Sequence, residues 1–180
     1  MVAIAKLIFL ASATATAATT QLLQRDVDTV IRDLEENLGP HIAALDNDVH
    51  AFPRSGIAGA LSINSDAEAL VSIVKGATAN VQSAGKFDEA GGADVIANIE
   101  ALVPQTLGTL DKIAQQATDW QNVPGGQKLV RTRLEALKEA FDKYIDAVIE
   151  AEPVLQKQVT TIKAHLTETF NTAIGKYPEF

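Results

Sequence analysis

Three histidines are the residues of this sequence best suited to metal or acid–base chemistry. They are His41, His50 and His165, and the chain contains no cysteine that could join them. A zinc site needs closely convergent ligands, such as two histidines one helical turn apart. No such pair is present, and His41 and His50 are interpreted, with Asp46 and Asp48, as solvated polar residues of a helix. The sequence therefore predicts no bound metal and no cofactor.

Other catalytic signatures are also missing from the sequence. There is no Gly-x-Ser-x-Gly segment, which removes the commonest hydrolase motif. The segment Gly125 to Lys128 lacks the length and the following Ser or Thr of a phosphate-binding loop, so we expect a turn between helices there. Acidic residues such as Asp142 and Asp146 lie near Lys or Arg at helical spacing, which indicates surface ion pairs. We expect a protein that is not an enzyme.

The charge of the chain limits its partners. It has 15 Lys and Arg residues against 23 Asp and Glu residues, a formal net charge of -8. Binding of nucleic acid, and strong attraction to anionic lipid, both need a basic face that neutralises phosphate. Neither partner is expected.

The first 17 residues have the pattern of a secretory signal peptide. A basic start at Lys6 precedes a short apolar run over residues 7–11 and small-x-small cleavage sites over residues 13–17. That run is far shorter than the roughly 20 apolar residues needed to cross a bilayer. We expect residues 1–17 to be removed, residues 18–180 to form one domain, and the protein to be secreted without a transmembrane segment.

Apolar side chains are the remaining candidates for function, and two interpretations of them stay open. They fill a core to normal density, or the small Ala and Gly residues of the second and third predicted helices leave a cavity shaped for an acyl chain. The residues expected to line such a cavity are Ala67, Leu70, Val74, Ala77, Ile99, Leu102, Leu107, Leu110, Phe141, Tyr144, Val148, Leu166 and Phe170. At its rim, Asn64, Thr78 and Tyr144 are candidates to meet a ligand head without burial of a bare charge.

The spacing of the apolar residues places them on helices. They recur every three or four residues, which places them on one face of a helix. This spacing is found in five segments: 20–52, 57 to Gly85, Asp88 (as N-cap) to Trp120, Gln127 to Pro153, and Leu155 to Tyr177. The pattern continues across Gly39-Pro40 and Pro104, as in helices that a proline kinks without ending. No segment alternates like a strand. The sequence predicts an all-α antiparallel bundle of about five long helices, two or three of them proline-kinked.

Several segments resemble one protein family. Residues 55–65 read SGIAGALSINS, residues 83–86 read SAGK, residues 99–104 read IEALVP, and the final helices are rich in Ala, Leu and Lys. The most telling parts are Gly59-Ala60-Leu61 and the mid-helix Leu102-Val103-Pro104. Through them the chain resembles the fungal hydrophobic surface-binding protein A family, which is related to the cell-wall galactomannoproteins. The resemblance spans essentially the whole mature chain.

The resemblance implies a secreted or wall-associated helical bundle that adsorbs to hydrophobic surfaces. Some galactomannoprotein domains hold a long-chain fatty acid inside the bundle. This chain lacks the second domain copy, the Ser/Thr-rich stalk and the anchor signal of wall-attached members, which favours a free single-domain form. We therefore expect a long-chain fatty acid or other lipid as the ligand. The alternative is a coat protein that adsorbs to hydrophobic surfaces and recruits a secreted hydrolase.

Overall fold

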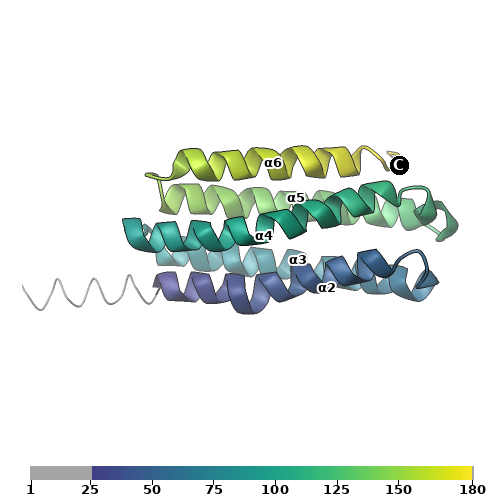
Figure 1. The fold of residues 1–180 in the computed structure, drawn as a ribbon, viewed down its shortest axis with the longest axis horizontal. Helices are drawn as coiled ribbons and strands as arrows, with labels where there is room; N and C mark the ends of the chain where they lie inside the picture. The colour runs from purple at the N-terminus through teal and green to yellow at the C-terminus, as the bar shows by residue number, and fades with distance from the viewer. Residues whose placement is uncertain (1–25, 180) are drawn as a thin grey trace, which may run out of the picture.

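Five long helices make up residues 26–179, which are the residues that the computed structural model describes. Residues 26–32 are α-helical and continue without a break into the π-helical segment η1 (Asp33–Leu38) and helix α2 (Gly39–Ala51). The other elements are α3 (Gly56–Ala84), α4 (Glu89–Gln115), the 3₁₀ turn η2 (Asp119–Asn122), α5 (Gly126–Ala151) and α6 (Gln156–Ile174) (Figure 1). No strand occurs in this range, so the all-α prediction is confirmed. The predicted signal peptide lies outside the described residues.

Glycine and aspartate residues end and begin helices where the sequence predicts. At the end of α3, Gly85 has a φ of 73°, a conformation that glycine adopts without steric cost. Asp88 caps α4, because its side chain accepts a hydrogen bond of 2.8 Å from the backbone N–H of Gly91. Gly125, with a φ of 69°, closes the turn that leads into α5. The turn ends at Gly125, and Gly126 to Lys128 already form the first turn of α5, so the turn expected over residues 125–128 is shorter than predicted.

Two prolines lie within helices, as predicted, and they lie close to each other. Ahead of Pro40, the N–H of Gly39 donates to the carbonyl of Leu34 five residues back, so the π-helical turn shifts the hydrogen-bond pattern before the proline interrupts it. Pro104 lies inside α4. A Cβ added to Gly39 would lie 3.3 Å from Cδ2 of Leu102, so the two proline-containing segments pack side by side.

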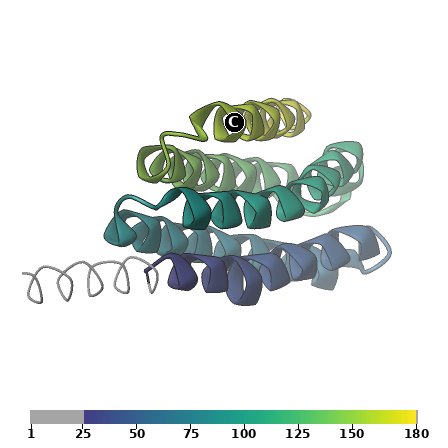
Figure 2. The same cartoon turned by 60° about the vertical axis from the view of Figure 1, so that its left-hand side comes forward.

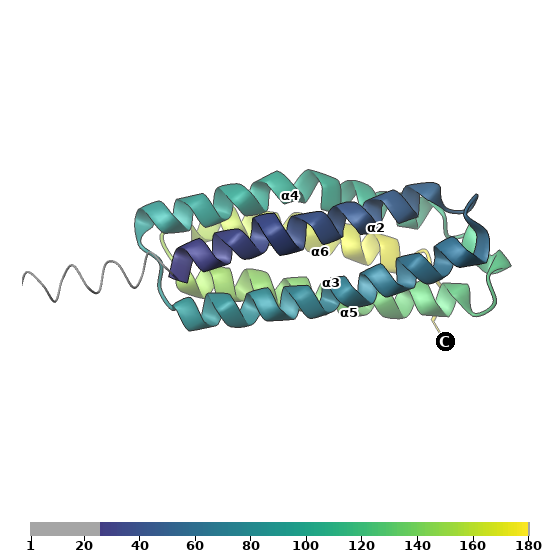
Figure 3. The same ribbon diagram turned by 90° about the horizontal axis from the view of Figure 1, so that it is seen from below.

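The helices form a closed ring rather than two layers. Each contacts two others: α2 with α3, α3 with α5, α5 with α6, α6 with α4, and α4 with α2. Helices that follow one another in the chain run antiparallel, as predicted, and this alternation makes the pairs α3–α5, α4–α6 and α2–α4 parallel (Figures 1 and 2). From below, α2 lies between α4 and α3, with α5 and α6 behind (Figure 3). The ring encloses a shared apolar interior.

The predicted extent of the third helix was wrong at its end. Helix α4 stops at Gln115, and Trp120 belongs to η2. The side-chain amide of the next residue, Gln116, donates to the backbone carbonyls of Val49 (2.8 Å) and Phe52 (2.7 Å). The chain then turns, and Trp120 stacks on Phe52 with ring centroids 4.4 Å apart. Contacts with α2 therefore override the local helical pattern.

The last helix is also shorter than predicted. Helix α6 ends at Ile174, and Tyr177 lies beyond it with its side chain buried. The Tyr177 hydroxyl donates to the carbonyl of Ile113 at 2.7 Å, while the Tyr177 carbonyl accepts from Arg131 at 2.7 Å. These two hydrogen bonds turn the chain end back onto α4 and α5.

Candidate functional site

Two small cavities, each of about 20 Å³, lie between the helices of the ring. The first, here called the Trp120 cavity, is lined by Leu45, Ile63, Asn64, Ala67, Ile113, Trp120, Leu129, Val130, Arg133, Leu134 and Leu137. The second, the Tyr144 cavity, is lined by Leu34, Leu38, Ile42, Ile99, Leu102, Val103, Thr106, Phe141, Tyr144, Ile145 and Leu166. Nearly all of these side chains are apolar, so both cavities suit hydrocarbon.

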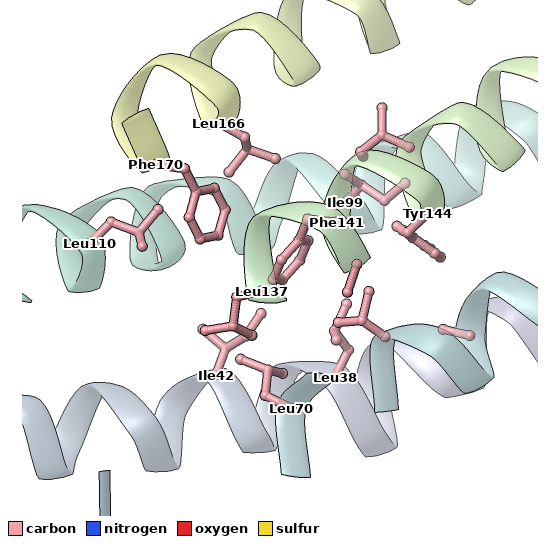
Figure 4. Close-up of a cluster of buried hydrophobic side chains, with 14 of the residues drawn as sticks. Leu38, Ile42, Leu70, Ile99, Leu110, Leu137, Phe141, Tyr144, Leu166 and Phe170 are labelled. Atoms are coloured by element: carbon pink, nitrogen blue, oxygen red, sulfur yellow. The ribbon is translucent and has the colours of Figure 1, made fainter. Parts of the chain in front are cut away.

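The two cavities follow each other along the bundle axis. On α5, Leu137 lines the Trp120 cavity and Phe141, one turn later, lines the Tyr144 cavity. These side chains belong to one buried cluster, in which Phe141 lies next to Phe170 of α6 with ring centroids 5.9 Å apart (Figure 4). The stretch of α5 from Val130 to Ile145 is about 22 Å long at 1.5 Å per residue. A long apolar ligand that lies along the axis would pass through both cavities.

The size of the cavities sets a condition on any such ligand. A volume of about 20 Å³ has room for about one water molecule. Sites for small-molecule ligands have volumes of about 300–1,000 Å³. An acyl chain therefore enters only if helices separate or side chains move.

The predicted lining residues lie inside the ring, but only some reach a cavity. Leu102 and Leu107 are half-buried, and the other predicted lining residues are buried. Ala67 lines the Trp120 cavity, while Ile99, Leu102, Phe141, Tyr144 and Leu166 line the Tyr144 cavity. The remaining residues line neither cavity and pack around them: Leu70, Val74, Ala77, Leu107, Leu110, Val148 and Phe170.

The three polar candidates have different surroundings. Tyr144 lines its cavity, is 1% exposed, and its hydroxyl has no hydrogen-bond partner. Burial, and secondarily the negative charge of Asp33, raise the pKa of Tyr144 well above its ordinary value, so the hydroxyl stays a neutral donor. Asn64 lines the Trp120 cavity and accepts a hydrogen bond of 2.8 Å from Nε of Arg133. Thr78 lines neither cavity and donates to the carbonyl of Val74 in its own helix at 2.8 Å.

Sequence reasoning missed two polar groups at the Trp120 cavity. Arg133 is its one lining cation, and it also donates to Glu68 at 2.8 Å. Its position one turn before Leu137, beside the apolar face of the helix, is a signal that could have found it. The indole N–H of Trp120 is buried without a partner. No pattern could have revealed this, because Trp120 was expected to continue a helix.

The contacts of the His41 and His50 side chains, which were expected to be solvated, are with the preceding helical turn. Nδ1 of His41 lies 2.7 Å from the carbonyl of Asn37, and Nδ1 of His50 lies 2.9 Å from that of Asp46, each one turn back. Among residues 26–179, no group of three His, Asp or Glu side chains is placed to hold a metal ion. The described part of the chain offers apolar volume and hydrogen-bond donors rather than a metal centre.

A surface groove leads toward the Tyr144 cavity. It has a volume of about 360 Å³ and lies between η1–α2 and α4, lined by Leu34, Glu35, Gly39, Pro40, Ala43, Asn98, Ala101, Leu102 and Gln105. Leu34 and Leu102 line both the groove and the cavity, so they separate the interior from solvent. A broader hollow over the outer face of α6 is lined by residues of that helix alone, so it is not a cleft between elements.

Comparison with known proteins gives a family and a fold. The sequence profile of the family "hydrophobic surface binding protein A" matches residues 27–150. No curated protein matches the chain in sequence.

Solved structures of fungal proteins share the fold. A crystal structure of Afmp4p in complex with palmitic acid has a TM-score of 0.78 at 21% identity, covering 84% of this chain and 99% of that one. Ligand binding domain 1 of the Penicillium marneffei MP1 protein, complexed with arachidonic acids, has a TM-score of 0.77 at 14% identity, covering 86% and 99%. Domain 2 of the same protein, with multiple arachidonic acids, has a TM-score of 0.71 at 13% identity, covering 87% and 96%. At these identities the likeness establishes the common helical fold.

Proposed function

Because the chain belongs to the hydrophobic surface binding protein A family, we propose that it is a non-enzymatic protein that binds long-chain fatty acyl lipid between its helices. The observation that carries this proposal is the pair of apolar cavities that follow each other inside the ring. The palmitic and arachidonic acids held by proteins of the same fold support it.

Burial of the acyl chain supplies the binding energy. Each methylene removed from water contributes about 0.8 kcal/mol, against the costs of ordering the ligand and separating the helices. The groove at Gly39 and Leu102 is the proposed entrance, because both helices that form it contain a proline and because Leu34 and Leu102 line both the groove and the Tyr144 cavity. A long acyl chain with one polar contact then reaches a micromolar Kd, which corresponds to a binding free energy of about -8 kcal/mol.

Titration with saturated acids of 16 to 20 carbons tests the proposal. An interior site should saturate at a defined stoichiometry and raise the melting temperature, because the ligand binds only the folded state. The fluorescence of Trp120, the single tryptophan, reports entry because its side chain lines one cavity. Mass spectrometry of lipid extracted from protein purified without detergent identifies the natural ligand. Absence of both saturable binding and thermal shift, with the acids and with their methyl esters, would contradict the proposal.

Adsorption to an apolar surface is the second candidate function, and one observation favours it. Ile57 and Leu61, one turn apart on α3, are 60% and 62% exposed. Helix α3 is also the one helix of the described chain that is long and apolar enough to cross a membrane by length and composition. Two results together would favour this function. The protein should coat a hydrophobic film without saturable lipid binding, and the double variant Ile57→Ser, Leu61→Ser should coat it less. Recruitment of a secreted hydrolase by such a coat stays a prediction.

Secretion is part of the proposal and rests on residues 1–17. The exported protein should begin between Thr16 and Gln21, which N-terminal sequencing of secreted material measures. A retained Met1 to Leu10 segment would contradict secretion by this route.

A further inference from the structure

Two buried tyrosines of the bundle differ in one respect that bears on the ligand. The Tyr177 hydroxyl donates to a carbonyl at 2.7 Å, whereas the Tyr144 hydroxyl, equally buried, has no partner. A buried donor without a partner is unfavourable, so proteins pair nearly all such groups. Tyr144 lines a cavity whose other lining groups offer it no hydrogen bond. An acceptor brought by a ligand would satisfy it.

The surroundings of Tyr144 determine which acceptor fits. No Lys, Arg or His lines this cavity, and its other hydroxyl, on Thr106, donates to the carbonyl of Leu102 at 2.9 Å. The charge that acts on the Tyr144 hydroxyl is negative, that of Asp33, which accepts hydrogen bonds from Asn37 and Asn80. Arg133 lines the other cavity, about 16 Å away along α5 at 1.5 Å per residue. An ionised carboxylate in this cavity would give up its hydrating water and receive one hydrogen bond from a neutral hydroxyl. The negative charge of Asp33 would also repel it.

We propose that the Tyr144 cavity receives the head of the acyl ligand as an uncharged hydrogen-bond acceptor, namely an ester carbonyl or a protonated carboxyl group, with the Tyr144 hydroxyl as donor. This inference rests on the proposed function and specifies its ligand class. The acyl tail extends from Tyr144 toward the Trp120 cavity. With the head in this cavity, neutral acyl lipids such as fatty esters bind more tightly than fatty acid anions.

A ligand series at pH 8 tests this selection with the mature chain. Methyl palmitate has a neutral acceptor head, palmitate a charged one, and heptadecane none; each is delivered from cyclodextrin and followed by Trp120 fluorescence. Methyl palmitate should bind at least about tenfold more tightly than palmitate, since the anion pays the desolvation of a charge. Tyr144→Phe should weaken the binding of methyl palmitate about threefold to tenfold, because one hydrogen bond is lost. The affinity for heptadecane, which makes no hydrogen bond, should stay the same.

The matched control and a spectroscopic readout keep the test specific. Tyr177→Phe removes an equally buried hydroxyl that lines neither cavity, so it should change no ligand affinity. The carbonyl stretch of bound methyl palmitate should shift to lower frequency in the wild type and lose that shift in Tyr144→Phe. Equal or tighter binding of palmitate, or an unshifted carbonyl, would overturn the inference while lipid binding stands. Failure of all three ligands to bind would instead overturn the proposed function.

Discussion

The half of the bundle around Trp120 and the half around Tyr144 are built from the same amphipathic helices, yet they are fastened differently. Around Trp120, side chains of Gln116, Tyr177 and Arg133 reach across to other helices, and Trp120 stacks on Phe52. Two polar atoms there, the indole N–H of Trp120 and Oε1 of Gln116, have no partner. Around Tyr144, hydrogen bonds from Asn80 to Asp33 and from Thr167 to Asp142 join helices, one buried hydroxyl lacks a partner, and two prolines interrupt neighbouring helices.

We therefore expect the Trp120 half to hold the ring together, and the groove between α2 and α4 to be where it opens. Leu34 and Leu102 line both this groove and the Tyr144 cavity, and each of the two helices contains a proline. Hydrogen bonds from Gln105 and Thr109 to Asp46 join the same helices toward the Trp120 end, so local opening is expected around Gly39 and Leu102. The predictions below test this division, beginning with the variant that should lose the most stability.

Removing the aromatic anchor should have the largest effect. Trp120→Ala deletes a side chain that is 1% exposed and stacked on Phe52, so it should lower the free energy of unfolding by about 3–5 kcal/mol. Chemical denaturation measures this loss. A loss below about 1 kcal/mol would show that the Trp120 half does not hold the ring together.

Filling the Trp120 cavity should lower the free energy of unfolding less than Trp120→Ala does, but it should also weaken lipid binding. Ala67 lines a cavity of about 20 Å³, so the ring of Ala67→Phe should overpack it and destabilise by about 1–3 kcal/mol. Lipid affinity should fall as well, because the acyl tail extends into this cavity. Ala79→Phe on the exposed face of the same helix is the control and should change stability by less than about 0.5 kcal/mol. Unchanged lipid uptake in Ala67→Phe would place the tail elsewhere.

The two tyrosines provide a sharper comparison of the halves. Tyr177→Phe removes one of the two donors to the Ile113 carbonyl, which keeps the backbone N–H of Gln116, and should lower the free energy of unfolding by about 1 kcal/mol. Tyr144→Phe removes a hydroxyl that has no partner, so stability should stay the same or rise by up to about 1 kcal/mol. Thermal unfolding of both variants measures the contrast. A larger loss in Tyr144→Phe would mean that this hydroxyl is paired in solution.

Widening the entrance should lower stability only slightly and act mainly on the rate of lipid uptake. Leu102 is only half-buried, so Leu102→Ala should cost about 1 kcal/mol, less than a buried leucine. Because this side chain separates the groove from the Tyr144 cavity, lipid uptake should become several-fold faster in stopped-flow fluorescence. Leu107→Ala, also half-buried on α4 but away from both cavities, is the control. Equal uptake rates in the two variants would contradict an entrance at Leu102.

The sequence by itself determined the helices, because helix formation depends on neighbours three and four residues away. The breaks near Pro53, at Gly85, at residues 125–126 and at Pro153 follow from backbone chemistry, as does the cap at Asp88. The inward faces of Phe141, Tyr144, Leu166 and Phe170 follow from the same spacing. The family could also be identified, because segments such as IEALVP at 99–104 can be recognised in the sequence without the structure.

Only the tertiary structure decided what depends on residues far apart in the chain. The order of helices in the ring, and the parallel packing of α2 with α4, place Gly39 against Leu102 and thereby create the groove. The same long-range contacts end α4 before Trp120 and bring Tyr177 to Ile113. They also leave the Tyr144 hydroxyl without a partner. A periodic pattern tells which face of a helix turns inward, but the position and chemistry of a cavity depend on which faces meet, and at what level.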